Sequence, residues 1–144
     1  MAETAEILEP ITVCGVSPEY LDRAWTVSAP HLAGALTRGC RGYTLEDVRR
    51  LLDDEKAMLW HVRRGDDVAA SVVCYPDRRG GCVHIWLMGG EDMEVWIDTL
   101  IQTLRRYARD EGLSALQAEV RPGLGRVLNR KGWQIQTTCT RLSL

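Results

Sequence analysis

The chain has 144 residues, of which 45% are hydrophobic and 26% are charged, and its formal net charge is −2. These values predict one globular domain over residues 1–144 and give no electrostatic basis for binding nucleic acid. No apolar run approaches about 20 residues, and no basic segment followed by an apolar one opens the chain, so we expect neither a membrane span nor secretion. We therefore expect a cytoplasmic protein, or one packaged in a virion.

The first half of the chain predicts, in order, a strand over 11–16, a helix from Ser17, a helix over 44–52, and strands over 57–63 and 68–75. Ser17-Pro18 and Thr44 are typical of helix starts, and Asp47 lies at the third helical position after Thr44. We expect Pro30 to interrupt or end the first helix, because proline removes a backbone donor. Gly65-Asp66-Asp67 supplies the tight turn of a hairpin.

The second half predicts a strand over 82–88, a long helix ended by Gly112, a strand over 114–120, a helix over 122–131 and a last strand over 134–144. The long helix keeps apolar residues at the i, i+3, i+4, i+7 spacing. The order β-α-α-β-β-β-α-β-α-β predicts an α/β fold with a mixed sheet and helices on both faces. Strands 82–88 and 114–120 should be parallel, joined by a right-handed crossover.

This order, with Gly112 before one strand and Arg130-Lys131-Gly132-Trp133 before the last, resembles the GNAT superfamily of acetyltransferases over nearly the whole chain. The resemblance implies that strand 82–88 binds the pantetheine arm of acetyl-CoA and that the start of the long helix binds its pyrophosphate. If an acyl-CoA binds, the implied cofactor-binding residues are Leu87, Met88, Gly89, Gly90 and Met93. Gly89-Gly90 is then either a substitute phosphate loop or simply a bend at the end of the strand.

The motif positions of that family hold other residues here. Segment 91–98 contains no glycine where the family has Gln/Arg-x-x-Gly-x-Gly/Ala, Arg121 stands at the asparagine position, and Leu128 stands at the tyrosine position. Four acidic residues crowd the first turn of the long helix: Glu91, Asp92, Glu94 and Asp98. We expect these carboxylates to cap the helix and to repel a polyanionic cofactor, so that no cofactor is bound.

Two further segments, 82–92 and 121–128, are similar to small GNAT-like proteins encoded by phages and prophages, some of them internal virion components. The first interpretation is therefore a phage-type GNAT-fold protein with a degenerate acyl-CoA site, which acts without catalysis through a virion or host protein partner. The alternative is an N-acyltransferase that uses acetyl-CoA to acylate an amine. A peptide-binding module with an open sheet edge is a third interpretation.

Two side chains are candidates for general base catalysis if the protein is an enzyme. His84 lies on the strand that would face the acyl group, and Glu119 lies on the neighbouring strand. The alternatives are a structural histidine in a strand and a solvent-facing glutamate. His31 and His61 have no carboxylate or cysteine at a suggestive spacing, and no Cys-x-x-Cys pair indicates a metal. The acyl acceptor and the oligomeric state do not follow from the sequence.

Overall fold

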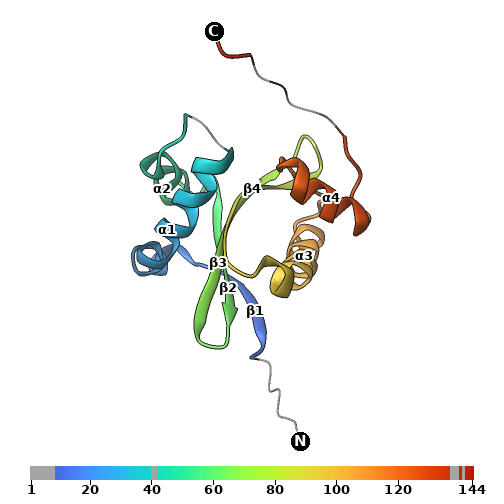
Figure 1. The fold of residues 1–144 in the computed structure, drawn as a ribbon. Helices are drawn as coiled ribbons and strands as arrows, with labels where there is room; N and C mark the ends of the chain where they lie inside the picture. Colours follow the sequence, from blue (N-terminus) through green and yellow to red (C-terminus); the bar gives the residue numbers. More distant parts are fainter. Residues whose placement is uncertain (1–8, 40–41, 137–139, 141) are drawn as a thin grey trace, which may run out of the picture.

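The structure is a computed structural model that describes residues 9–39, 42–136, 140 and 142–144. A five-stranded sheet with the order β1-β2-β3-β4-β5 forms its centre (Figure 1). The strands are β1 (Ile11–Gly15), β2 (Met58–Arg64), β3 (Asp67–Asp77), β4 (Cys82–Gly90) and β5 (Ala115–Ala118). The helices are the 3-10 turn η1 (Pro18–Tyr20), α1 (Leu21–Gly39), α2 (Leu45–Asp53), α3 (Met93–Asp110) and α4 (Pro122–Arg130).

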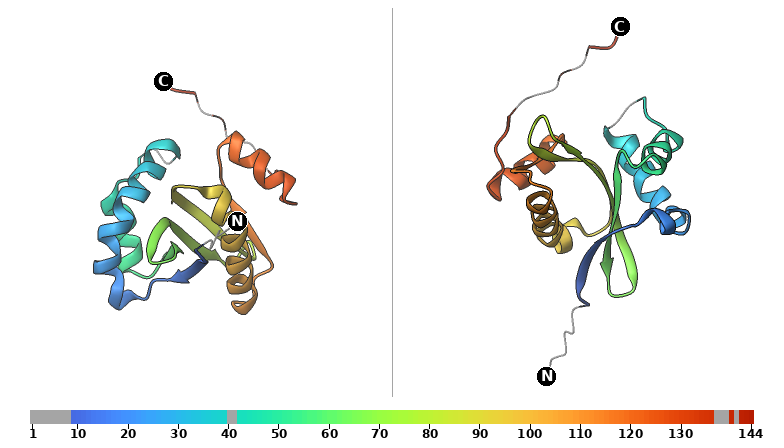
Figure 2. Two further views of the ribbon diagram at one scale, coloured as in Figure 1. Left: turned by 60° about the horizontal axis from the view of Figure 1, so that its bottom comes forward. Right: turned by 180° about the vertical axis from the view of Figure 1, so that it is seen from behind.

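Neighbouring strands are antiparallel from β1 to β4, whereas β4 and β5 are parallel. Helices α1 and α2 cover one face of this sheet, and α3 and α4 lie over the other (Figures 1 and 2). The predicted mixed α/β fold with helices on both faces is confirmed. None of the helices in the described ranges is long and apolar enough to cross a membrane.

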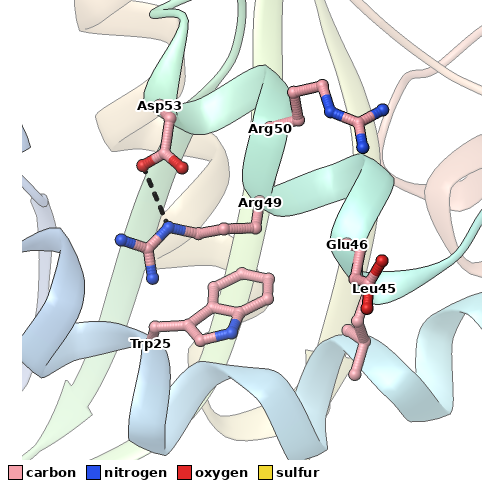
Figure 3. Close-up of a pocket in the computed structure, with 6 residues that line it drawn as sticks. All are labelled: Trp25, Leu45, Glu46, Arg49, Arg50 and Asp53. Carbon is pink, nitrogen blue, oxygen red and sulfur yellow. Dashed lines mark hydrogen bonds and ion pairs between the residues drawn. The ribbon is translucent and has the colours of Figure 1, made fainter.

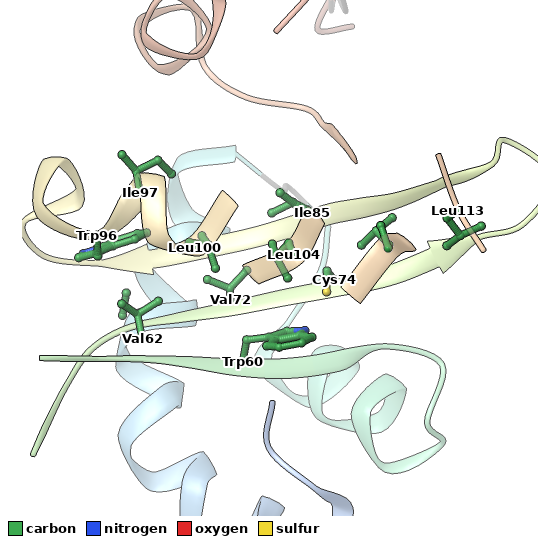
Figure 4. Close-up of a cluster of buried hydrophobic side chains, with 13 residues drawn as sticks. Trp60, Val62, Val72, Cys74, Ile85, Trp96, Ile97, Leu100, Leu104 and Leu113 are labelled. Carbon is green, nitrogen blue, oxygen red and sulfur yellow. The ribbon is translucent and has the colours of Figure 1, made fainter. Parts of the chain in front are cut away.

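Each face of the sheet has its own apolar core. The α3 face buries Trp96, Leu100 and Leu104 against the strands, and Trp60 adds its aromatic ring to this cluster from β2 (Figure 4). The other face buries residues of α1 and α2, including Leu32 and Val48. Burial of such side chains, at roughly 1.5–3 kcal/mol each, holds both helical layers on the sheet.

The start of α2 follows the predicted local chemistry. The Thr44 hydroxyl accepts a hydrogen bond from the Asp47 backbone N–H at 3.1 Å, and the Asp47 carboxylate accepts one from the Thr44 N–H at 2.9 Å. These reciprocal bonds form a capping box, which satisfies two backbone donors that a helix start otherwise leaves free. They also lower the pKa of Asp47.

Two predicted features are wrong. Helix α1 runs through Pro30 to Gly39, because Pro30 faces solvent while Leu32, Ala35 and Leu36 beyond it are buried in the core. The predicted last strand is absent from residues 134–136, 140 and 142–144, where the chain has no strand partner and leads away from the sheet (Figure 1). Residues 137–139 and 141 of that predicted strand lie outside the described part of the chain.

Strand β4 contains a bulge at Trp86. Val73 of β3 pairs with Leu87 and Cys74 pairs with Ile85, so Trp86 is an extra residue in the ladder. The bulge changes which face the following side chains occupy: Ile85 packs in the α3 cluster, whereas Leu87 packs under α1 and α2. It therefore bends β4 at the centre of the sheet.

Candidate functional site

The carboxyl half of β4 has a free edge. β4 pairs with β5 only over Cys82–Ile85, opposite Ala115–Ala118, and the pairing stops where the bulge begins. From Trp86 to Gly90 the strand bonds to β3 on one side, and no other described strand pairs with its second side. Backbone groups on that second side therefore have no strand partner among the described residues, although Leu87 and Gly89 are buried. We call the segment from Trp86 to Gly90 the free edge of β4.

The two glycines at the end of the free edge are required by packing. A Cβ atom on Gly89 would lie 2.1 Å from the carbonyl oxygen of His31 in α1, and one on Gly90 would lie 2.5 Å from the Cα atom of Ala70 in β3. Gly90 also has φ +152°, which favours glycine. Both glycines lie inside β4, paired with Ser71 and Ala70, which fits the bend at a strand end.

The remaining residues of the implied cofactor site lie along the same segment. Leu87 is buried, Met88 is partly buried on the α3 face, and Met93 is the first residue of α3. The side chain of Leu87 points into the core, so only its backbone lies on the free edge. Binding of an acyl-CoA by these residues stays a prediction.

The start of α3 differs from the predicted capped helix. Asp92 occupies the N-cap position with a left-handed backbone, φ 56° and ψ 45°, and its side chain caps no backbone N–H. The prediction that its carboxylate caps the helix is wrong, because the carboxylate pairs with Arg64 and accepts no backbone N–H. Among the described residues, the N–H groups of Met93 and Glu94 have no hydrogen-bond acceptor. Two backbone donors therefore remain at the positive end of the helix dipole.

Trp96 fixes the loop between β4 and α3. Its indole N–H donates to the backbone carbonyl of Glu91 at 2.6 Å, and the Glu91 N–H donates to the Ala69 carbonyl at 3.1 Å. The ring itself is buried in the α3 core. The loop is thus held to both α3 and β3, so its backbone donors are preorganised.

Basic side chains from two other elements face the acidic segment 91–98. Arg64 of β2 lies 3.5 Å from the carboxylate of Asp92, and Lys131, just after α4, lies 2.8 Å from that of Asp98. The sequence suggested four uncompensated carboxylates, but two of them have counter-ions. The electrostatic repulsion of an anionic ligand is therefore weaker than the sequence alone indicates.

The two predicted catalytic candidates are brought together. The parallel pairing of β4 with β5 sets His84 opposite Gln117, and Glu119 follows two residues later, just beyond the end of β5 rather than within the strand as predicted. Burial lowers the pKa of His84, and the carboxylates of Glu119 and Asp77 raise it by smaller amounts. A neutral imidazole beside a carboxylate is suited to accept a proton. The catalytic roles of His84 and Glu119 stay predictions.

Tyr75 is a neighbour of this pair that the sequence reasoning missed. It lies opposite His84 in the β3–β4 ladder, with ring centroids 5.0 Å apart. Burial raises the pKa of Tyr75, and the charges of Asp77 and Glu119 add to this. The available signal was segment 76–81, because its proline and two glycines favour a turn that folds β3 back onto β4.

The positions at which the family carries an asparagine and a tyrosine have no such chemistry here. Arg121 is exposed at the N-cap of α4 and its side chain makes no capping bond. Leu128 is buried and apolar. A proton donor at the site would therefore have to come from another element, and Tyr75 is the phenol that lies beside His84.

A buried polar chain links α1 to the sheet. His61 Nε2 lies 2.8 Å from the Ser28 hydroxyl, which lies 2.9 Å from the Ser71 hydroxyl, and this in turn lies 2.9 Å from His31 Nδ1. Ser28 and Ser71 are fully buried, and His61 is 4% exposed. We call these four residues the His–Ser chain. The sequence signal for this chain was a set of polar residues on one helix face and in two strands, at positions where the pattern predicts buried apolar residues.

The stability of the fold is expected to fall as the pH drops below 6.5. Burial lowers the pKa of both His31 and His61 from 6.5, so the unfolded chain binds protons that the folded chain excludes. The resulting contribution to the free energy of unfolding is fully present above pH 6.5. It is lost as the pH falls toward the lowered pKa values of the two folded-state histidines. Each histidine accounts for at most about 1.4 kcal/mol per pH unit.

Urea unfolding at about pH 7.5 and 5.5 measures this loss, and His61→Asn should flatten the dependence relative to the unmodified chain. A pH dependence that His61→Asn leaves unchanged would show that the His–Ser chain does not exclude protons.

A shallow pocket lies between α1 and α2 (Figure 3). It has a volume of about 310 Å³ and is lined by Trp25, Leu45, Glu46, Arg49, Arg50 and Asp53. The Arg49 guanidinium lies 5.6 Å from the Trp25 ring centroid and donates to Asp53 at 3.0 Å, and it also pairs with Asp22. These partners already satisfy the charge of Arg49, and the pocket is not lined by any residue of the β4 edge or of α3.

Comparison with known proteins identifies the fold. No family model matches the sequence, and no curated protein matches it. Among solved structures, a ribosomal-protein-alanine N-acetyltransferase from Brucella melitensis biovar Abortus 2308 matches with a TM-score of 0.66 and 18% identity, over 93% of this chain and 98% of that one.

Two further structures give the same result. An aminoglycoside acetyltransferase from an uncultured soil metagenomic sample, in complex with sisomicin, matches with a TM-score of 0.65 and 10% identity, over 93% of this chain and 96% of that one. Glucosamine-6-phosphate N-acetyltransferase from Arabidopsis thaliana matches with a TM-score of 0.62 and 10% identity, over 94% of this chain and 99% of that one. The chain has the fold of the GNAT acetyltransferases.

Proposed function

We propose that this protein is an acyl-CoA-dependent N-acyltransferase that transfers an acyl group from a thioester to an amine. The observation that carries the proposal is a pair of neighbouring backbone segments without a partner among the described residues. One is the free edge of β4 from Trp86 to Gly90, and the other is the N–H groups of Met93 and Glu94 at the start of α3. The likeness in fold to solved N-acetyltransferases supports it.

The free edge and the start of α3 suit different parts of such a substrate. An extended arm that contains amide groups can add to an unpaired strand edge through backbone hydrogen bonds. A diphosphate can accept hydrogen bonds from the N–H groups of Met93 and Glu94 at the positive end of the helix. Arg64 and Lys131 would reduce the repulsion from the acidic segment. The cofactor would supply the activated acyl group.

The proton chemistry would fall to His84 and its neighbours. The neutral imidazole would accept the proton that the amine loses as it attacks, and Glu119 would stabilise the imidazolium that results. Tyr75, whose raised pKa keeps the phenol protonated, would be available as a donor near the same strand. Proton transfer would then depend on residues of β3 and β4 and on Glu119 just after β5, rather than on α4, where Leu128 has no polar group.

A second candidate is the non-catalytic, phage-type protein that acts through a virion or host protein partner. It is favoured by the carboxylates of Glu91 and Glu94, which lack an ion-pair partner among the described residues, and by the lack of glycine in segment 91–98. Such a protein would bind no acyl-CoA. The cytoplasm or the virion would be its location.

Titration calorimetry with acetyl-CoA, followed by an assay of CoA release with a panel of amines, separates the two candidates. Glu94→Gln removes one negative charge from the start of α3, and we expect it to tighten acetyl-CoA binding by about two- to fivefold. Asp110→Asn makes the same chemical change at the far end of α3 and should leave the affinity unchanged. If neither protein binds acetyl-CoA, the second candidate replaces the first.

A further inference from the structure

Aromatic side chains gather on the α1/α2 face of the sheet, where the free edge of β4 begins. Tyr75 and His84 are paired across β3 and β4, with ring centroids 5.0 Å apart. Trp86 lies two residues beyond His84, about 7 Å along the same strand. Tyr43, just before α2, meets the Trp86 ring edge-on, with centroids 5.1 Å apart. We call these four residues the aromatic wall.

The register of the strands places the wall on one face of the sheet. Val83 and Ile85 pack in the α3 core, so His84 between them points to the opposite face. Tyr75 and Trp86 pack against the core under α1 and α2. None of the four side chains of the wall is fully buried. The wall therefore has one side against this core and another side toward solvent.

The border of the wall carries two carboxylates. Asp77 lies two residues after Tyr75 and therefore on the same face of β3. On the other side, Gln117 of β5 lies opposite His84, and Glu119 follows just beyond the strand. The charges of Asp77 and Glu119 both raise the pKa of Tyr75 and of His84, which agrees with these positions. A molecule bound on the wall therefore meets negative charge at its border.

Aromatic rings with carboxylates beside them suit a cation that carries an aromatic group. An alkyl amine is protonated near neutral pH, and its ammonium group is attracted both by carboxylates and by the faces of aromatic rings. An aromatic group on the same molecule gains by packing against tryptophan and tyrosine. A sugar phosphate would instead meet like charge at Asp77 and Glu119, and a polyhydroxylated amine would place hydroxyl groups against apolar rings.

We propose that the acyl acceptor is a positively charged amine with an aromatic group, that it binds on the aromatic wall, and that Tyr43 and Trp86 select it. This inference rests on the proposed function and names its substrate class. The wall meets the free edge at Trp86, so an amine beside His84 lies next to the segment that would hold the thioester. In the reaction the nitrogen forms the C–N bond and the C–S bond breaks. Of the two protons that the ammonium loses, one leaves on the CoA thiol and one passes through His84 to water.

Steady-state kinetics of the full chain with acetyl-CoA and two amines of similar basicity test this selection. We expect kcat/KM for 2-phenylethylamine to exceed that for ethanolamine by about 30-fold, the ratio that burial of one phenyl ring gives. Tyr43→Ala removes an exposed ring of the wall and should reduce this ratio about fivefold. Tyr20→Ala is the matched control, because it removes a tyrosine of similar exposure, 56% against 52%, from η1 and should leave the ratio unchanged.

The indole N–H resonance of Trp86, assigned by its loss in Trp86→Phe, gives a second readout that needs no turnover. We expect saturating 2-phenylethylamine to shift this resonance, and ethanolamine to shift it less. Acylation of both amines at equal rates, a ratio that Tyr43→Ala leaves unchanged, or an indole that 2-phenylethylamine does not shift would overturn the inference while leaving the proposed function intact. Turnover of no amine would overturn the proposed function and this inference with it, even where the indole resonance shifts.

Discussion

Replacing Gly89 by alanine is expected to lower the free energy of unfolding by about 3 kcal/mol, at the upper end of what overpacking costs. The new Cβ atom would lie 2.1 Å from the His31 carbonyl oxygen and 2.8 Å from the carbonyl carbon, and neither backbone atom can move without displacing α1. A shift of α1 would also stretch the hydrogen bond between His31 and Ser71. Chemical denaturation of the purified variant measures the loss.

Gly123 provides the matched control for this substitution. It lies in helix α4, and the nearest atom to an added Cβ is a guanidinium nitrogen of Arg126 at 3.9 Å. Gly123→Ala should therefore be stabilising by about 0.5–1 kcal/mol, since alanine is the better helix former. Equal stabilities for Gly89→Ala and Gly123→Ala would mean that α1 does not approach β4 as closely as described.

If the protein is an acyltransferase, His84→Asn is expected to reduce kcat by about 10²-fold or more, the usual contribution of a general base. In the unmodified enzyme, the fall of kcat at acid pH should be centred below pH 6.5, because burial lowers the pKa of His84 and the base must be neutral to accept a proton. Glu119→Gln removes a charge that raises this pKa, so it should move that fall in rate to lower pH.

Acetyl-CoA affinity is the control for this prediction. His84 lies before the bulge and is paired with Tyr75, so its replacement should leave the free edge of β4 and the dissociation constant for acetyl-CoA unchanged. A His84→Asn protein with full kcat would remove His84 from the proposed chemistry. It would leave acyl-CoA binding by the free edge as a separate question.

The sequence predicted those parts of the fold that depend on short-range chemistry. The spacing of Leu100, Leu104 and Ala108 identified α3, and Thr44 with Asp47 marked the start of α2 through a local pair of hydrogen bonds. Pro30 misled the prediction because its local effect was outweighed by burial of the helical residues that follow it. Local helix propensity predicts the end of a helix poorly where burial of the following residues compensates for an unfavourable residue such as proline.

The candidate site depends more on contacts between distant segments. The bulge at Trp86 could not be predicted from a run of apolar residues, since it arises from the register between β3 and β4. Arg64 and Lys131 reach the acidic segment from elements remote in sequence, and His31 meets Ser71 across 40 positions of the chain. Composition therefore showed the carboxylates of segment 91–98 but not the cations that face them.

Mapping acetyl-CoA onto the backbone by amide NMR tests the central claim most directly, because the claim concerns main-chain groups. We predict saturable shifts of amides within Trp86–Gly90 and of the amides of Met93 and Glu94, which lie along the free edge of β4 and at the start of α3. No shift at saturating ligand, or shifts confined to the pocket between α1 and α2 around Trp25 and Arg49, would contradict it.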